Sequence, residues 1–313
     1  MTANPGTTTA HPPTGTPGQP NPGRTPRDRQ KRFGESGQAL NMFSHGFLML
    51  WAVLILFPIF WVVLGAFKNN AEIGGSAWSW PSHWSMDAFD RAWTKGIGSY
   101  LTNTVIVLLL SVTLTMFLGA MAAYVLARYE FRGNRFIYYL FVSGVMFPVY
   151  LALVPLFFQV NNLRMLNTYH GLALVYTAFS MPFTVFFLHS FFRTLPTAVY
   201  EAALIDGASH TRAFFQVMAP MAKPGLISVG IFNVLGQWNQ YLLPVVLMQQ
   251  QRGDAEAHQM VSQGLVNLLV VQGYSGDFPG LFAGMTIAMI PVLVVYLSFQ
   301  RQVQAGLSAG TLK

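Results

Sequence analysis

The chain of 313 residues is 53% hydrophobic and only 9% charged, whereas soluble domains carry about 25% charged residues. This composition predicts a polytopic membrane protein rather than a soluble one. The formal net charge of +7 does not indicate nucleic-acid binding, because the basic residues lie in short segments between apolar runs. The absence of cysteine excludes disulfides, thiol nucleophiles and cysteine-ligated zinc.

Residues 1–36 are rich in Pro, Gly and Thr and contain a cluster of arginine and lysine. Such a segment cannot bury enough apolar surface to offset its ordering entropy, so we expect a disordered cytoplasmic tail. A cleaved signal peptide is the alternative, but the apolar run that follows is too long for one. We expect residues 37–313 to form a single domain.

Six charge-free apolar runs follow, each with the roughly 20 residues that a helix needs to cross about 30 Å of hydrocarbon. They lie near 45–67, 101–126, 136–159, 171–192, 225–248 and 280–300. Placing both termini in the cytoplasm leaves only five of the 18 Lys and Arg residues outside, namely Lys68, Arg91, Lys95, Arg164 and Arg252. This asymmetry favours cytoplasmic termini and puts the loop 193–224 in the cytoplasm.

The loop 193–224 carries its own helix signals. Pro196 suits a first helical turn and Gly207 supplies a positive φ, so we expect a short helix from about Pro196 to Asp206. Ser209 can cap a second helix, which prolines 220 and 224 then break. Loops of about 4 to 6 residues suffice to join two helices, so this longer elbow indicates a docking element. An amphipathic connector without a partner is the alternative.

The spacing of Glu-Ala-Ala, Gly and Pro in this loop resembles the EAA loop of the permease subunits of bacterial binding-protein-dependent ABC importers. Val217 and Ala219 stand where the family usually has Ile and Leu. The resemblance implies an all-α type I importer permease with six transmembrane helices and a cytoplasmic coupling helix. It also implies that an ATPase is contacted by Glu201, Ala202, Ala203, Asp206 and Gly207.

Other stretches resemble the carbohydrate-type branch of these permeases, in particular the second permease of maltose- or multiple-sugar-type importers. They include Ala122–Arg128, Val154–Leu156, Trp238–Asn239 and Gly306–Gly310, whereas Gln240 stands where an acidic residue commonly follows Trp-Asn. The resemblance implies a bacterial cell-membrane protein that pairs with a second permease as a heterodimer. It further implies two cytoplasmic ATPases and an extracytoplasmic solute-binding protein as partners.

No catalytic or metal site is predicted in this chain. It contains no Gly-Lys dipeptide, which excludes a phosphate-binding P-loop, so ATP and Mg²⁺ must be bound by partner ATPases. No His-Glu-x-x-His or comparable ligand spacing occurs among the seven histidines. We therefore expect a non-catalytic subunit with membrane lipid, but no cofactor and no nucleic acid, as a partner.

Polar side chains within spans are costly unless paired or facing water, so they are candidates for a solute pathway. One predicted helical face would hold Asn233, Gln237 and Gln240, which fall at i, i+4 and i+7. The neighbouring Trp238 could stack on a sugar ring, and Asn239 lies next to it in the sequence. The alternative is that these amides join neighbouring helices. Small residues at 276, 280, 284 and 288 predict a close helix contact, within this chain or with a second permease.

An ion-coupled secondary carrier of small polar solutes is the main rival function. It would need an intramembrane carboxylate or similar site, and none of the eleven Asp and Glu residues lies in a predicted span. A membrane-bound enzyme or receptor is the other rival, but a nucleophile motif and a soluble domain are lacking. The sequence leaves open whether a sugar, polyol or glycerol-phosphate is carried.

Overall fold

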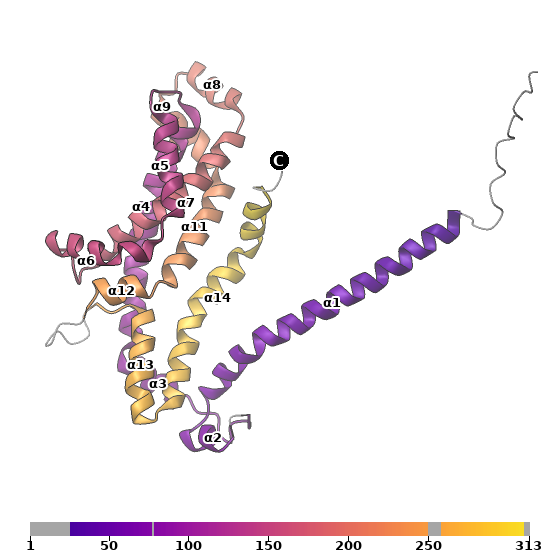
Figure 1. The fold of residues 1–313 in the computed structure, drawn as a ribbon, viewed down its shortest axis with the longest axis vertical. Coiled ribbons are helices and arrows are strands. Elements are labelled where there is room, and N and C mark those ends of the chain that lie inside the picture. The colour runs from indigo at the N-terminus through magenta and orange to yellow at the C-terminus, as the bar shows by residue number, and fades with distance from the viewer. Residues whose placement is uncertain (1–25, 77, 250–257, 310–313) are drawn as a thin grey trace, which may run out of the picture. The chain divides into compact units, whose positions relative to one another are not determined.

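Every element that the structure describes is a helix, and no strand occurs in residues 26–76, 78–249 and 258–309 of this computed structural model (Figure 1). The chain divides into two units, residues 1–59 and 60–313. The first unit, where it is described, is helix α1 as far as Ile59. The second unit holds all the other helices.

The elements fall into three length classes. The long helices are α1 (Pro26–Gly65), α4 (Gly98–Arg128), α7 (Tyr169–Thr194) and α14 (Phe278–Ala309). Those of intermediate length are α5 (Asn134–Met146), α6 (Leu153–Asn162), α11 (Lys223–Trp238) and α13 (Val261–Ser275). The short ones are α2 (Asn70–Gly75), α3 (Asp87–Ala92), η1 (Trp93–Ile97), η2 (Val149–Ala152), α8 (Thr197–Ile205), α9 (His210–Ala213), η3 (Phe214–Met218), α10 (Ala219–Met221) and α12 (Leu242–Leu247).

Four described helices are long and apolar enough to cross a membrane. They are Asn41–Gly65, Asp87–Arg128, Tyr169–Thr194 and Phe278–Gln302, and they match the first, second, fourth and sixth predicted runs. Two bent helix pairs bring the number of crossings to as many as six. The prediction of an all-α membrane protein is confirmed.

The predicted span 136–159 is not one continuous helix, which corrects the sequence-based expectation. Its two halves, α5 and the segment Tyr150–Asn162, are bent by 87° relative to each other. Phe147 takes an extended conformation (φ −75°, ψ 124°) because it precedes Pro148, and a residue before proline is disfavoured in the α region.

The predicted span 225–248 is also interrupted. Helix α11 ends at Trp238, and the separate helix α12 begins at Leu242. Pro244 has no N–H to donate to the carbonyl of Gln240 four residues earlier, and that carbonyl instead accepts a hydrogen bond from the Ser262 hydroxyl at 2.7 Å. Gln240 therefore lies beyond α11, off the helical face that was expected to join it to Asn233 and Gln237.

Helix α13 was not predicted, because its apolar run, Val261–Val270, is too short to be a span. It packs against the start of α4, where an added Cβ on Gly264 would overlap the ring of Tyr100. It also packs on α14, where a Cβ on Gly284 would lie 3.0 Å from Leu268. The small-residue row therefore provides a close contact within this chain at Gly284.

The predicted tail, residues 1–36, falls on both described and undescribed parts of the chain. Residues 1–25 lie outside the described residues, whereas residues 26–36 form the first turns of α1 instead of the expected disordered chain. The predicted boundary between a tail and a domain at residues 36 and 37 stays a prediction.

Candidate coupling site

The predicted elbow helix is present as α8. Pro196 precedes it in an extended conformation and Asp206 ends it, which matches the predicted Pro196–Asp206 segment. Gly207 follows with φ of +83°, and a Schellman motif closes the helix: the Gly207 N–H donates to Leu204 O and the Ala208 N–H to Ala203 O, both at 3.0 Å. The glycine is required by its backbone conformation, as predicted.

The second half of the elbow is also helical and is anchored in the bundle. The Ser209 hydroxyl accepts a hydrogen bond from the Arg212 N–H at 3.3 Å and so caps α9, as predicted. The helix continues through η3 and α10 and then bends by 77° at Ala222 into α11. Phe214 and Met218 are buried against α4 and α7, so this half is fixed to the bundle.

Helix α8 presents one exposed face to its surroundings. Ala198, Glu201, Ala202 and Ile205 are all exposed, and they follow the i, i+3, i+4, i+7 spacing of a single helical stripe. Ile205 is 85% exposed, more than any other large hydrophobic residue in the described chain. An exposed isoleucine beside two alanines suits insertion into an apolar groove of another protein.

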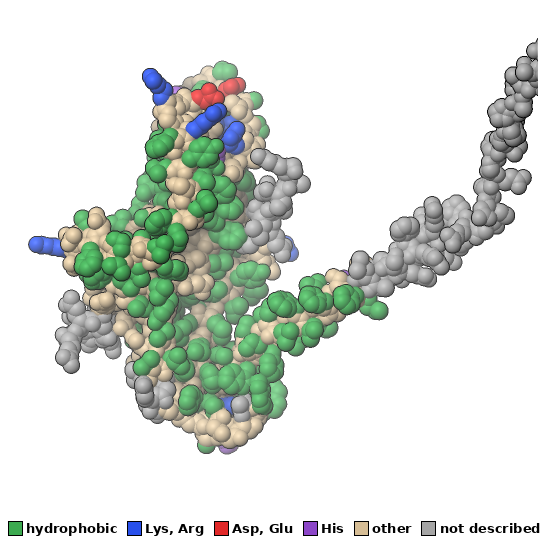
Figure 2. Space-filling model, viewed as in Figure 1, with side chains coloured by type: hydrophobic (Ala, Val, Ile, Leu, Met, Phe, Trp, Pro, Cys, Tyr) green, Lys and Arg blue, Asp and Glu red, His purple; other side chains and the backbone are tan. Residues whose placement is uncertain are grey.

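The other predicted contact residues lie around this stripe. Ala203 is half-buried on the inward side, next to Leu204, whereas Asp206 and Gly207 are exposed beyond the helix end. Figure 2 shows acidic and basic side chains gathered at this end of the bundle, with largely hydrophobic surface along its length. Sequence reasoning missed Ala198 and Ile205, because the family motif does not contain them. The helical period could have revealed both, since Ala198 lies three residues before Glu201 and Ile205 lies three residues after Ala202.

Polar side-chain contacts attach α8 to the end of α4 and to α9. Arg128 donates to Leu195 O at 2.6 Å and to the Thr197 hydroxyl at 2.9 Å. The hydroxyls of Tyr129 and Tyr200 lie 3.1 Å apart, and the Tyr200 hydroxyl lies 2.7 Å from His210 Nδ1. Burial, together with the neighbouring Tyr129 hydroxyl, raises the pKa of Tyr200 to about 12, so this hydroxyl keeps its proton at physiological pH.

The predicted pathway residues Asn233 and Gln237 are buried inside this chain. Asn233 Nδ2 donates to the Thr184 hydroxyl at 2.9 Å. Gln237 Nε2 donates to the Ser180 hydroxyl at 3.0 Å, and its carbonyl accepts from Ser111. In this conformation both amides therefore make the helix-packing contacts that were the alternative to pathway lining.

The other three predicted pathway residues lie at the end of α11. Trp238 is buried in a hydrophobic cluster with residues of α4, α13 and α14. Asn239 is exposed and its side-chain amide donates to Leu235 O at 2.8 Å, while Gln240 is partly exposed. The structure thus does not bring the five residues together on one open surface.

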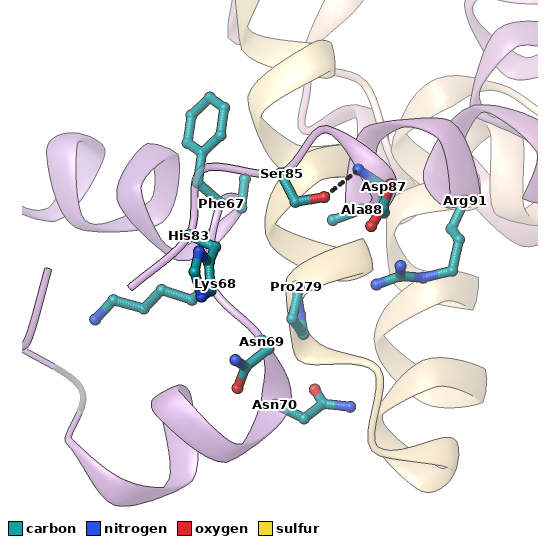
Figure 3. A pocket seen from close by; sticks show the side chains of 11 residues that line it. Phe67, Lys68, Asn69, Asn70, His83, Ser85, Asp87, Ala88, Arg91 and Pro279 are labelled. Carbon is teal, nitrogen blue, oxygen red and sulfur yellow. Dashed lines mark hydrogen bonds between the residues drawn. The ribbon is translucent and has the colours of Figure 1, made fainter. Parts of the chain in front are cut away.

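A cavity of about 260 Å³ lies at the opposite end of the bundle from α8. It is bounded by the segment 66–70 that follows α1, by α3 and the residues before it, and by the start of α14 (Figure 3). Several of its polar lining groups already hold the local fold. Asn69 Oδ1 accepts from the Glu72 N–H at 2.9 Å, and Asn70 Oδ1 accepts from the Phe278 N–H at 3.2 Å. The first contact caps α2 and the second joins the start of α2 to the start of α14, so we assign these lining groups a structural role.

Within the described residues, no group of three or more His, Asp or Glu side chains could hold a metal ion. The candidate site consists of the exposed face of α8 and its attachment to the bundle.

Residues 115–309 match the model of a protein family described as "Binding-protein-dependent transport system inner membrane component". This match covers more than half of the chain and includes the whole elbow. The chain belongs to this family. It is accordingly a multi-pass inner-membrane permease component of an ABC importer and not an enzyme, as the sequence predicted.

Two relatives extend the similarity over most of the chain. The diacetylchitobiose uptake system permease protein NgcG of Streptomyces coelicolor is 51% identical over 271 residues, which cover 86% of this chain and 88% of that protein. The probable ABC transporter permease protein YurM of Bacillus subtilis is 34% identical over 267 residues, covering 85% and 87%. At this coverage the similarity extends into residues 1–114, which lie outside the family match.

A solved structure supports the same fold. A chain in the crystal structure of a bacterial ABC transporter involved in the import of the acidic polysaccharide alginate matches with a TM-score of 0.72. The match covers 90% of this chain and 99% of that chain at 21% identity. The predicted type I permease fold is thereby confirmed.

Proposed function

We propose that this chain is the permease subunit of an importer for a short carbohydrate and that α8 is its coupling helix. The observation that carries the coupling role is the exposed stripe of Ala198, Glu201, Ala202 and Ile205 on a helix without buried residues. Ile205, which is 85% exposed, together with the adjacent alanines offers an apolar contact surface that supports a protein partner at this end of the bundle.

The proposed partner at this face is a cytoplasmic ATPase that binds ATP and Mg²⁺. The family to which the chain belongs depends on a binding protein, and this chain carries no P-loop of its own. We propose two copies of the ATPase, one extracytoplasmic solute-binding protein and a second permease that pairs with this chain as a heterodimer. The distribution of Lys and Arg supports a cytoplasmic position for α8 and for both termini.

The proposed substrate class follows from the relatives. The relative that is 51% identical is named for diacetylchitobiose uptake, and another, 29% identical, is named for arabinooligosaccharide transport in Bacillus subtilis. We therefore propose a short oligosaccharide as the solute, with diacetylchitobiose as the first compound to test. The solute would pass between the two permeases when ATP binding moves α8.

The pathway role of Asn233, Gln237, Trp238, Asn239 and Gln240 stays a prediction. Asn233, Gln237 and Trp238 are buried within the chain, so they would meet a solute only after the helices around α11 rearrange. Asn239 and Gln240 are accessible without such a change and are the better candidates for mutation.

The first test is purification of the tagged chain from its native membrane in mild detergent, followed by mass spectrometry of the proteins retained. The wild type is expected to retain a P-loop ATPase and a second permease. Ile205→Glu places a charge in the proposed apolar groove and should reduce the retained ATPase about tenfold or more. Ile205→Met, which keeps an apolar side chain of similar volume, is the matched control.

Two outcomes would contradict these proposals, the first for the docking face and the second for the importer function. Equal retention of the ATPase by the wild type and Ile205→Glu would remove Ile205 from the docking face. Solute uptake by the purified chain alone, driven by an ion gradient, would favour the secondary carrier and overturn the importer proposal.

A further inference from the structure

Helix α8 has few contacts with the rest of the chain, so its attachment determines how a force on it reaches the bundle. None of its residues is buried. The backbone leaves the helical conformation on both sides of it, at Leu195 (φ −75°, ψ 139°) and Pro196 before it and at Gly207 (φ +83°) after it. A continuous helical rod therefore does not join α8 to α7 or to α11.

The side-chain contacts provide a different connection, from α8 to α4. Tyr200 is one of the α8 residues that face the bundle. Its hydroxyl lies between the hydroxyl of Tyr129, just after α4, and the imidazole of His210 on α9. Arg128, the last residue of α4, bonds the backbone at Leu195 and the side chain of Thr197, which is the first residue of α8.

Aromatic packing supports the same connection. The buried ring of Tyr124 on α4 lies with its centroid 5.9 Å from that of Tyr129 and 6.5 Å from that of Tyr200. It also lies 5.5 Å from Phe192 on α7 and 4.8 Å from Phe214 on η3. The end of α4 is thus the place where α7 and both halves of the elbow meet.

Helix α4 is in turn joined to α7 and α11 across the apolar interior. Thr177 on α7 donates to the Ser111 carbonyl on α4 at 3.3 Å, and the Ser111 hydroxyl bonds Gln237 on α11. Asn233 on α11 bonds Thr184 on α7. Polar bonds in an apolar environment have no water to compete for them, so these contacts link α4 to α7 and α11, and a movement of α4 is expected to reach both.

We propose that Arg128, Tyr129, Tyr200 and His210 form a clamp that passes the movement of α8 to α4, and through α4 to α7 and α11. The clamp residues are positioning residues, because they transmit the movement without touching the solute or ATP. This inference rests on the proposed coupling role of α8.

The test uses the complete transporter, co-purified and reconstituted in liposomes with its binding protein and ATP. The double variant Tyr129→Phe/Tyr200→Phe removes the two hydroxyls and keeps both rings, so the aromatic packing is preserved. Tyr139→Phe, at a tyrosine that is 64% exposed on α5, is the same chemical change outside the clamp. The measured quantities are ATP hydrolysis, solute uptake and the ratio of the two.

The double variant is expected to assemble and hydrolyse ATP, while the solute moved per ATP falls about threefold or more relative to Tyr139→Phe. If the double variant transports like the wild type and moves the same amount of solute per ATP, the clamp is overturned and the coupling role of α8 is left intact. A wild-type complex without an ATPase would instead overturn the proposed function. Failure of the double variant to assemble would mean that the hydroxyls serve folding, and it too would overturn the clamp.

A distance measurement tests the clamp independently of transport. The chain has no cysteine, so spin labels can be placed on Val199→Cys in α8, an exposed position outside the proposed docking stripe, and on Arg132→Cys, an exposed position just beyond α4. The label distance in the assembled complex should be the same without nucleotide and with ATP. In the double phenylalanine variant it should differ between the two states. A distance that changes equally with and without the tyrosine hydroxyls would contradict the clamp.

Discussion

Gly207 sets the geometry of the elbow because its backbone adopts a left-handed conformation. An ideal Cβ on Gly207 would meet nothing within 4 Å, so space is available for a larger side chain. The cost of a substitution is therefore the backbone strain at φ +83°, about 1–2 kcal/mol for a residue with a Cβ. A substitution at Gly207 therefore tests the backbone conformation without a steric clash of the new side chain.

Gly207→Val should misdirect the end of α8, because a β-branched residue disfavours positive φ. We expect ATP-dependent uptake to fall about tenfold while the variant is inserted in the membrane at the normal level, measured by uptake in cells and by immunoblotting of membranes. Gly207→Asn is the control, since asparagine tolerates this region, and it should retain most of the uptake. Full uptake by Gly207→Val would show that the Schellman motif is not needed for coupling.

The residue scale also shows what the sequence could and could not predict. Gly207 and Ser209 were predictable because their roles are local, a positive φ and a helix cap. The environments of Asn233 and Gln237 were not, because a polar residue in a span fits either a pathway or a helix contact. Only the positions of Thr184 and Ser180 on another helix favour the packing arrangement for this conformation.

Helices α4 and α7 approach each other closely where small residues allow it. An added Cβ on Gly119 of α4 would lie 2.5 Å from Thr184 Cγ2 on α7. This contact is one turn away from the cluster around Tyr124, so it supports the segment of α4 that carries the clamp.

Gly119→Leu should force the two helices apart and lower the stability of the bundle by about 1–3 kcal/mol, a typical cost of overpacking. The expected result is a clearly lower midpoint of thermal unfolding in detergent, followed by the fluorescence of the native tryptophans. Gly236→Ala is the matched control, because a Cβ at that exposed position of α11 meets nothing within 4 Å. A midpoint for Gly119→Leu that equals the control would mean that α4 and α7 can separate without cost.

At the element scale, the existence of the helices was more predictable than their continuity. The run 101–126 contains no proline and is a single helix, but the runs that contain Pro58, Pro182 and Pro291 are continuous helices as well. Proline content alone therefore did not reveal which run would be interrupted. The run 136–159 contains Pro148, and its length alone concealed the 87° bend. Composition also could not predict α13, since ten apolar residues fit a buried helix, a loop or part of a span equally well.

At the scale of the second unit, an ion-pair cluster joins segments that are far apart in the sequence. Asp277, just before α14, accepts hydrogen bonds from Arg91 on α3 and Lys95 on η1, with nitrogen–oxygen distances of 3.0 Å in both ion pairs. The Gly280 N–H also donates to the Asp277 carboxylate at 3.2 Å. No short-range sequence pattern predicts this contact, because its partners lie more than 180 residues apart.

These contacts make the cluster a pH-dependent contribution to stability. The Arg91 guanidinium above all, then Lys95 and the Gly280 N–H, lower the pKa of Asp277 to about 2 against the opposing effect of burial. In the unfolded chain the pKa of this carboxyl is about 3.9. Because the folded pKa is the lower one, the contribution is present above about pH 4 and is lost as the pH falls toward 2.

Asp277→Asn should therefore lower the midpoint of thermal unfolding at pH 7, since Arg91 and Lys95 lose their shared carboxylate. The difference from the wild type should shrink as the pH is lowered from about 4 toward 2, where the wild-type carboxylate is itself protonated. Glu130→Gln, at an exposed carboxylate beyond the end of α4, is the control for removing one negative charge. A difference between Asp277→Asn and the wild type that stayed constant over this pH range would show that the cluster stabilises the fold by packing rather than by charge.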